Sequence, residues 1–264
     1  MTHPYDLSFT DVSLSLLLMA LAIALARLKG LGIEKSLALG TVRTFVQLTL
    51  IGYALNFLFL STSLSVFVAV ALAMLAVAAW EAVRRQQVRI PRFYLIAFVS
   101  LAAALALSTA VVVALIIRPE PWHSLVITIP LTGMVLGNSL NVISLSADRF
   151  LSELRLRRDE VETALSLAAP PSQALHPVFK SAVSSALIPA INALMTVGLV
   201  QLPGVMTGQI LAGTPPMEAI KIQIVIMMMW IATGVVSGVI STTLLSRQLV
   251  NRRWQVRWEL LPED

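Results

Sequence analysis

Residues 93–117 read FYLIAFVSLAAALALSTAVVVALII and contain no charged side chain. About 20 apolar residues in a helix are enough to cross the hydrocarbon layer of a bilayer. The run is continuous rather than alternating, which favours a helix over a strand of a transmembrane barrel. This segment therefore predicts an integral membrane protein built from helices.

The composition of the whole chain supports the same class of protein. Of its 264 residues, 57% are hydrophobic and 12% are charged, whereas soluble domains carry about 25% charged residues. The mean hydropathy of +0.84 implies more apolar surface than one folded core can bury. These values exclude a soluble enzyme, a disordered chain and a fibrous repeat. Cysteine is absent, so disulfides, thiolate metal sites and a cysteine nucleophile are excluded as well.

Seven stretches are long and apolar enough to span a membrane. We therefore predict an all-α, polytopic protein in which residues 1–264 form a single transmembrane domain. The predicted spans are Val12–Leu28, Ser36–Leu60, Leu64–Trp80, Phe93–Ile117, Leu125–Leu145, Val178–Val200 and Ile220–Leu245.

The basic residues predict how these spans are oriented. The chain has 19 Lys and Arg residues, and nearly all of them flank alternate spans on one side. By the positive-inside rule this predicts a protein of the cell membrane whose N-terminus is outside the cell and whose C-terminus is in the cytoplasm. The same distribution explains the pI near 10.1 without nucleic acid as a partner. The predicted inner residues are Arg27, Lys29, Lys35, Arg84, Arg85, Arg89, Arg92, Arg149, Arg155, Arg157, Arg158, Lys180, Arg247, Arg252, Arg253 and Arg257.

The longest inner loop is predicted to span residues 146–177. Its apolar residues follow helical spacing and oppose a charged face, which indicates an amphipathic helix over residues 151–168. Pro170 and Pro171 prevent its continuation. The helix either lies in the membrane interface or serves as a coupling element that docks a cytoplasmic partner. Its apolar stripe consists of Leu151, Leu154, Val161, Leu165 and Ala168.

A second irregular segment, residues 201–219, reads QLPGVMTGQILAGTPPMEA and is rich in proline and glycine. It is either an ordinary outer loop or a re-entrant segment that lines a cavity. Glycines spaced by four residues occur at Gly133–Gly137, Gly204–Gly208 and Gly234–Gly238. In the fifth and seventh predicted spans, which hold the first and last of these pairs, such spacing favours close helix packing. Near the C-terminus, Trp254 and Trp258 predict a short helix in the inner interface, with a disordered tail as the alternative.

The polar residues within the spans indicate whether the chain could drive transport by itself. No acidic residue lies within a predicted span, and the histidines are scattered at positions 3, 123 and 176. Ion-coupled carriers usually place a carboxylate or histidine at membrane depth. The chain also lacks the glycine-rich phosphate loop that would bind ATP, and it carries no recognisable catalytic motif. If it transports actively, its energy should come from a separate ATPase, so it is not expected to be an enzyme itself.

A few uncharged polar residues and one arginine occur within or next to the spans. They either form hydrogen bonds between helices or face a polar path. We predict that the path is lined by Arg43, Gln47, Asn138, Asn141, Asn192, Met195 and Gln209.

Three runs resemble one family of permeases. They are GMVLGNSLNVISLSADR (133–149), EVETALSLAA (160–169) and NALMTVGLVQLPGVMTGQILAG (192–213), the last followed by Pro-Met-Glu-Ala-Ile. They are similar to the FetB-type iron-export permeases of ATP-binding-cassette (ABC) transporters, a family that includes plant permeases linked to aluminium tolerance. The resemblance implies export of iron or another metal and a FetA-type ATPase subunit that holds ATP and Mg²⁺. Seven helices per chain are few for a gated path, so a permease homodimer is also expected.

The inner loop also resembles the Glu-Ala-Ala loop with which ABC permeases contact their ATPase. The resemblance assigns coupling to Arg158, Glu162 and Ala164, with Glu160 beside them, but Ala168 replaces the glycine of that pattern. The residues identify no metal ligand. Three alternatives stay open: an ion-coupled carrier or channel acting alone, an ABC permease for an organic solute such as a nucleotide sugar, and a membrane scaffold without cargo.

Overall fold

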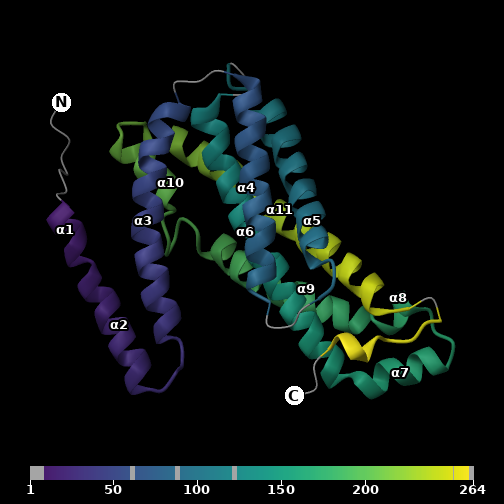
Figure 1. Ribbon diagram of the computed structural model, residues 1–264. Coiled ribbons are helices and arrows are strands. Elements are labelled where there is room, and N and C mark those ends of the chain that lie inside the picture. The colour runs from purple at the N-terminus through teal and green to yellow at the C-terminus, as the bar shows by residue number, and fades with distance from the viewer. Residues whose placement is uncertain (1–8, 60–62, 87–89, 121–123, 252, 262–264) are drawn as a thin grey trace. The chain divides into compact units, whose positions relative to one another are not determined.

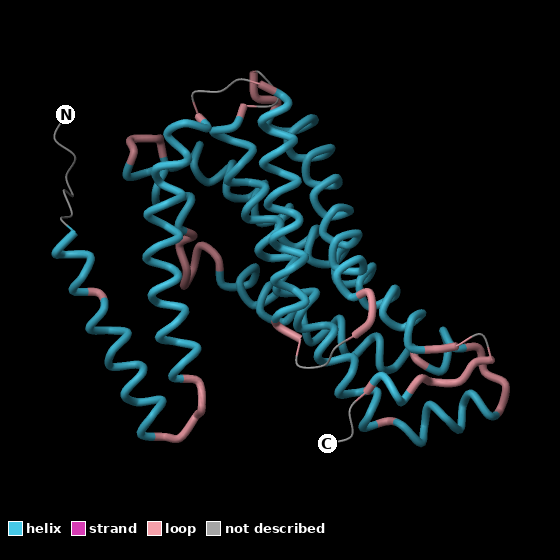
Figure 2. Tube along the Cα trace, viewed as in Figure 1, coloured by secondary structure: helices cyan, strands magenta, loops and turns pink. Residues whose placement is uncertain are grey.

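The computed structural model describes residues 9–59, 63–86, 90–120, 124–251 and 253–261 (Figure 1). These residues are helical and contain no strand (Figure 2). Seven helical segments are long and apolar enough to cross a membrane, as the sequence predicts. Leu60, Arg89, Arg252, His3 and His123, which figure in the sequence analysis, lie outside the described residues. The seven segments are Asp11–Leu28, Glu34–Asn56, Leu64–Arg84, Phe93–Ile117, Leu125–Leu156, His176–Thr196 and Pro216–Leu249.

The chain divides after Ser61 into two compact units. Unit 1 contains α1 (Phe9–Leu14), α2 (Leu16–Leu28) and α3 (Glu34–Leu58), and α2 packs on α3. The turn between these two helices uses Gly30 and Gly32 at φ +64° and +71°, a conformation that is unstrained only for glycine. Most of the described side chains of unit 1 are exposed and apolar. Unit 1 therefore depends on lipid or other protein surfaces for its burial.

Unit 2 is a bundle around the long helix α6, which packs on α4, α5, α9 and α11. Two of its helices, α6 and α9, continue through an internal proline. The end of the fourth span is a π-helix, labelled η1, which the sequence did not predict. The elements are α4 (Leu64–Arg84), α5 (Phe93–Ser108), η1 (Thr109–Ile117), α6 (Leu125–Leu156), α7 (Arg158–Ser166), α8 (Pro171–Ala174), α9 (His176–Thr196), α10 (Gly204–Leu211), α11 (Pro216–Leu249) and the 3₁₀ turn η2 (Trp258–Leu260).

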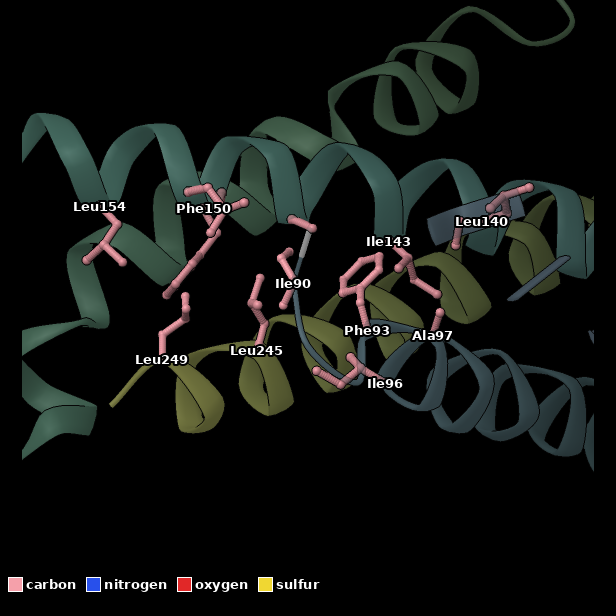
Figure 3. Close-up of a cluster of buried hydrophobic side chains, with 14 of the residues drawn as sticks. Ile90, Phe93, Ile96, Ala97, Leu140, Ile143, Phe150, Leu154, Leu245 and Leu249 are labelled. Atoms are coloured by element: carbon pink, nitrogen blue, oxygen red, sulfur yellow. The ribbon is translucent and has the colours of Figure 1, made fainter. Parts of the chain in front are cut away.

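The largest buried cluster joins α4, α5, α6, α9 and α11 near the end of unit 2 that carries α7. Figure 3 shows Phe93 from α5 and Phe150 from α6 pointing into it beside Leu245 and Leu249 from α11. Burying each such side chain contributes about 1.5–3 kcal/mol where the alternative is water. These four residues tie the ends of three helices together.

The helices α6 and α11 approach each other closely at Gly234 and Gly238. A Cβ atom added to Gly238 would lie 2.9 Å from Val142 Cγ1, and one added to Gly234 would lie 3.0 Å from Asn138 Nδ2. The close packing predicted for this glycine pair is thereby confirmed. The Asn138 Nδ2 amide donates to the Trp230 carbonyl oxygen at 2.6 Å, across the same contact.

The other glycine pairs behave differently. An added Cβ at Gly137, Gly204 or Gly208 meets no atom within 4 Å, and one at Gly133 meets only the flexible end of Met74 at 3.5 Å. The close packing predicted for Gly133–Gly137 is therefore found at Gly133 but not at Gly137 among the described residues. Gly204 and Gly208 lie outside the predicted spans, and the close-packing prediction does not extend to them.

Two predictions about helix boundaries after residue 145 are corrected. The single amphipathic helix over 151–168 is wrong, because α6 runs on to Leu156 and a separate α7 begins at Arg158. Leu151 and Leu154 are buried in the main cluster, so their apolar side chains extend α6 instead of opening a new helix. The last span is likewise longer than predicted, since α11 covers Pro216–Leu249.

The predicted helix at Trp254 and Trp258 is also wrong. The chain turns back after α11, and Val250 bridges Val256 in antiparallel fashion. The Asn251 side-chain oxygen accepts hydrogen bonds from the Arg253 and Gln255 amides, which stabilises this turn. We call residues 253–261 the C-terminal segment. It ends with Leu261 buried in the main cluster, and this burial explains why the segment folds onto the protein.

The α6–α11 contact makes a direct prediction. Gly238→Ala should lower the free energy of unfolding by about 1–3 kcal/mol, because the new methyl group overpacks against Val142. Thermal unfolding of the purified protein measures this. Gly137→Ala is the matched control, since its methyl group meets no neighbour and alanine favours a helix. Equal stability of the two variants would contradict the assigned contact.

Candidate functional site

The helix α7 is anchored on one face and exposed on the other. Val161 is buried and joins the main cluster, and Leu165 packs against it. On the exposed face of α7, Arg158 Nε lies 3.2 Å from Glu162 Oε1. Arg157 pairs with Glu153 and Glu160. These pairs are largely exposed, so each contributes at most about 1 kcal/mol to stability. The charged face is free to contact another protein.

Two large apolar side chains frame this charged face. Leu156 and Leu167, just before and just after α7, are 82% and 79% exposed. Because water would penalise such exposure, side chains of this kind often mark an interaction surface when they flank ordered polar residues. We call Leu156, α7 and Leu167 the α7 surface.

The C-terminal segment lies against one flank of α7. The Arg158 guanidinium sits 4.7 Å from the centre of the Trp258 ring, a cation–π contact. A groove of about 850 Å³ separates the two elements and is lined by Glu162, Ser166, Arg257 and Glu259 among others. On the opposite flank, a smaller hollow of about 280 Å³ lies between Ala164 and the start of α9. Both flanks of α7 are therefore accessible.

The end of α7 explains the role of Ala168. Ala168 has φ +63°, the left-handed conformation in which helices commonly end at a glycine. The Ala169 amide donates to the Ala164 carbonyl and the Ala168 amide to the Leu165 carbonyl, both at 3.0 Å. The glycine that the Glu-Ala-Ala pattern expects would fit this position better. The backbone at Ala168 thus adopts a conformation that glycine favours, although the residue is alanine.

The residues predicted to line a path do not share one environment. Arg43 is half-buried and Gln47 exposed, both on α3 of unit 1. On α6, Asn138 bonds α11, whereas Asn141 Oδ1 accepts a hydrogen bond from Arg85 Nη1 at 2.7 Å. The two asparagines therefore face different helices despite their spacing. No described contact tests whether these residues line a path, so that role stays a prediction.

The remaining predicted path residues lie on α9 and α10. Asn192 and Met195 are exposed near the end of α9. Gln209 on α10 is half-buried, and its Oε1 atom is buried without a hydrogen-bond donor among the described residues. Gln223 on α11 is not among the residues predicted from the sequence. Its side chain is only 5% exposed, and its Oε1 atom also lacks a hydrogen-bond donor among the described residues. The available signal was an isolated amide within an apolar span.

The described residues hold no group of three or more His, Cys, Asp or Glu side chains that could bind a metal ion. The longer helices do include Glu81 near the end of α4 and Asp148 towards the end of α6, beyond the predicted spans. The chemistry available within the bundle is thus mainly that of amides and hydroxyls. It can accept and donate hydrogen bonds.

Comparison with known proteins decides the family. The model of UPF0014, described as an uncharacterised protein family, matches residues 9–250. The chain belongs to the UPF0014 family. No solved structure matches it. The match covers all seven of the segments that are long and apolar enough to cross a membrane, so this UPF0014 protein is a multi-pass membrane protein.

Three relatives of this UPF0014 protein carry informative names. A UPF0014 membrane protein of Synechocystis is 37% identical over 95% of this chain and 97% of its own length. The Arabidopsis protein named ALUMINUM SENSITIVE 3 is 31% identical over 89% and 85%. An Escherichia coli protein named probable iron export permease protein FetB is 29% identical over 96% of both chains. The resemblance drawn from the sequence is confirmed, and the last of these relatives is named a permease.

The unusual backbone at Ala168 makes a second prediction. Ala168→Gly should stabilise the end of α7 by about 1 kcal/mol, because glycine removes the cost of the left-handed conformation. Slower hydrogen exchange of the α7 amides measures the gain. Ala164→Gly, inside the helix, should instead speed exchange. Faster exchange in Ala168→Gly than in the unmodified protein would contradict the assignment.

Proposed function

We propose that this protein is the permease subunit of an ABC transporter that exports iron or another metal ion. Its membrane-embedded helices would provide the path, and a separate FetA-type ATPase would bind ATP and Mg²⁺. The observation that carries the proposal is the α7 surface, an exposed charged helix fixed to the central helix α6. The E. coli relative named as a probable iron export permease supports both the transport role and the cargo.

The anchoring of α7 suits it to transmit force. Val161 belongs to the same buried cluster as Leu154 of α6 and Val178 of α9. A partner that pulls on the outer face of α7 would therefore move these two helices with it. A helix held only by lipid could not transmit such a movement.

The chemistry of the bundle also favours an external energy source. No acidic residue or histidine lies within the predicted spans, whereas ion-coupled carriers usually place one at membrane depth. The proposal places the N-terminus outside and α7 in the cytoplasm, according to the positive-inside rule. Two permease chains would pair with two ATPase subunits, because closed twofold symmetry is the commonest arrangement of homodimers.

The α7 surface supplies the test. Leu167→Ser should weaken association with the co-expressed ATPase at least tenfold, because Leu167 would be buried at the interface. Leu199→Ser is the matched control, since Leu199 is 89% exposed but lies between α9 and α10. Quantitative co-purification measures both. Equal association of the two variants with the ATPase would remove the α7 surface from the proposal.

A second variant separates coupling from docking. Glu162→Gln breaks the exposed pair with Arg158 and should change the free energy of unfolding by less than about 1 kcal/mol. We expect export per ATP hydrolysed to fall while the fold is retained, and vesicle transport assays measure this ratio. Glu218→Gln, which removes an exposed carboxylate at the start of α11, is the control. An unchanged ratio in Glu162→Gln would exclude a coupling role for that carboxylate.

A further inference from the structure

The helices α10 and α11 are neighbours both in the chain and in space. Residues 212–215 connect them, and the two helices are in contact. Val205 of α10 packs against a buried cluster that contains Ile226 of α11 together with residues of α5, η1 and α6. Val205 therefore marks the face of α10 that is turned towards the bundle.

Two glutamines lie on the corresponding faces of these helices. Gln209 follows Val205 by four residues, and Gln223 precedes Ile226 by three. Residues three or four apart share a helix face. Gln209 therefore shares with Val205 the face of α10 that is turned towards the bundle, and Gln223 shares with Ile226 the face of α11 that lines the same cluster.

Both amides present a buried acceptor without a donor. The Oε1 atoms of Gln209 and Gln223 are buried and receive no hydrogen bond from the residues that the structure describes. Gln223 as a whole is 95% buried, with a relative exposure of 5%. Buried amide oxygens are nearly always hydrogen-bonded, since the loss of water is otherwise uncompensated. A packing role alone would be better served by leucine or methionine.

We propose that Gln209 and Gln223 form a binding site for the hydrogen-bond donors of a metal-containing cargo. This rests on the proposed transport function and adds Gln223 to it. The donors are either the water ligands of a hydrated divalent cation or the O–H groups of a metal chelate. Neutral amide oxygens suit both, because they accept these hydrogen bonds without binding a bare cation as tightly as carboxylates would. Met206 and Met227, which are close to the glutamines in the sequence, are buried thioethers and add no hydrogen-bond donor.

Direct binding to the purified full-length protein in lipid nanodiscs tests the site. The probes are aqueous Fe²⁺ under anaerobic conditions and ferric citrate, each followed with radioactive iron. Gln209→Met and Gln223→Met remove the acceptor at similar volume, and each should weaken binding of one probe at least tenfold. The weakened probe identifies the source of the donors. Gln201→Met, an exposed amide before α10, is the matched control and should bind normally.

A rescue variant guards against a folding defect. Gln223→Glu keeps an acceptor oxygen and adds negative charge, so it should bind Fe²⁺ at least as tightly as the unmodified protein. Unchanged binding of both probes by both methionine variants would overturn the site, as would a failure of the unmodified protein to bind either probe. A loss of binding in Gln223→Glu equal to that in Gln223→Met would also overturn it.

The outcomes separate this inference from the proposed function. Binding needs no ATPase, so the site can be found or refuted on the permease alone. If the methionine variants still support normal ATP-driven export, the site is wrong and the transport function stands. If the unmodified protein neither associates with an ATPase nor exports metal, the proposed function fails whatever the binding shows.

Discussion

The contact between α6 and α11 is the constraint on which the rest of unit 2 depends. Between helices in a membrane, lipid is as apolar as leucine, so close backbone approach and hydrogen bonds replace the hydrophobic effect. Gly234 and Gly238 permit that approach, and the Asn138 amide reaches the Trp230 carbonyl across it. Because α6 also packs on α4, α5 and α9, a displacement of α6 would shift these three helices as well as α11.

That rigidity extends to α7. The central helix α6 continues unbroken from Leu125 to Leu156, and α7 begins two residues later. The cluster around Phe150 and Leu154 joins this end of α6 to α11, while the C-terminal segment braces the flank of α7 through Trp258. A movement imposed on α7 is therefore passed to packed helices and not absorbed by a flexible loop. This arrangement is consistent with the externally driven permease that we propose.

The sequence was sufficient for those features that one helix determines alone. Length and hydropathy predicted seven spans, and glycine spacing predicted the contact at Gly234–Gly238. Features that depend on neighbouring helices were not accessible. The stripe with Leu151 and Leu154 has the same spacing in an interfacial helix as in a core helix, and only the cluster around it distinguishes them. Likewise, the position of Trp258 in the sequence is compatible with a helix in the membrane interface. Only its cation–π contact with Arg158 shows that it packs against α7. A role for Gln223 could be inferred only once α10 was found in contact with α11.

The central claim is that this chain has no energy source of its own and is driven by a partner through α7. The most direct measurement is iron transport by the purified permease in sealed vesicles, with a proton or sodium gradient but no nucleotide. The account predicts no net transport under these conditions, and transport once the ATPase and MgATP are added. Gradient-driven accumulation of iron by the permease alone would contradict it.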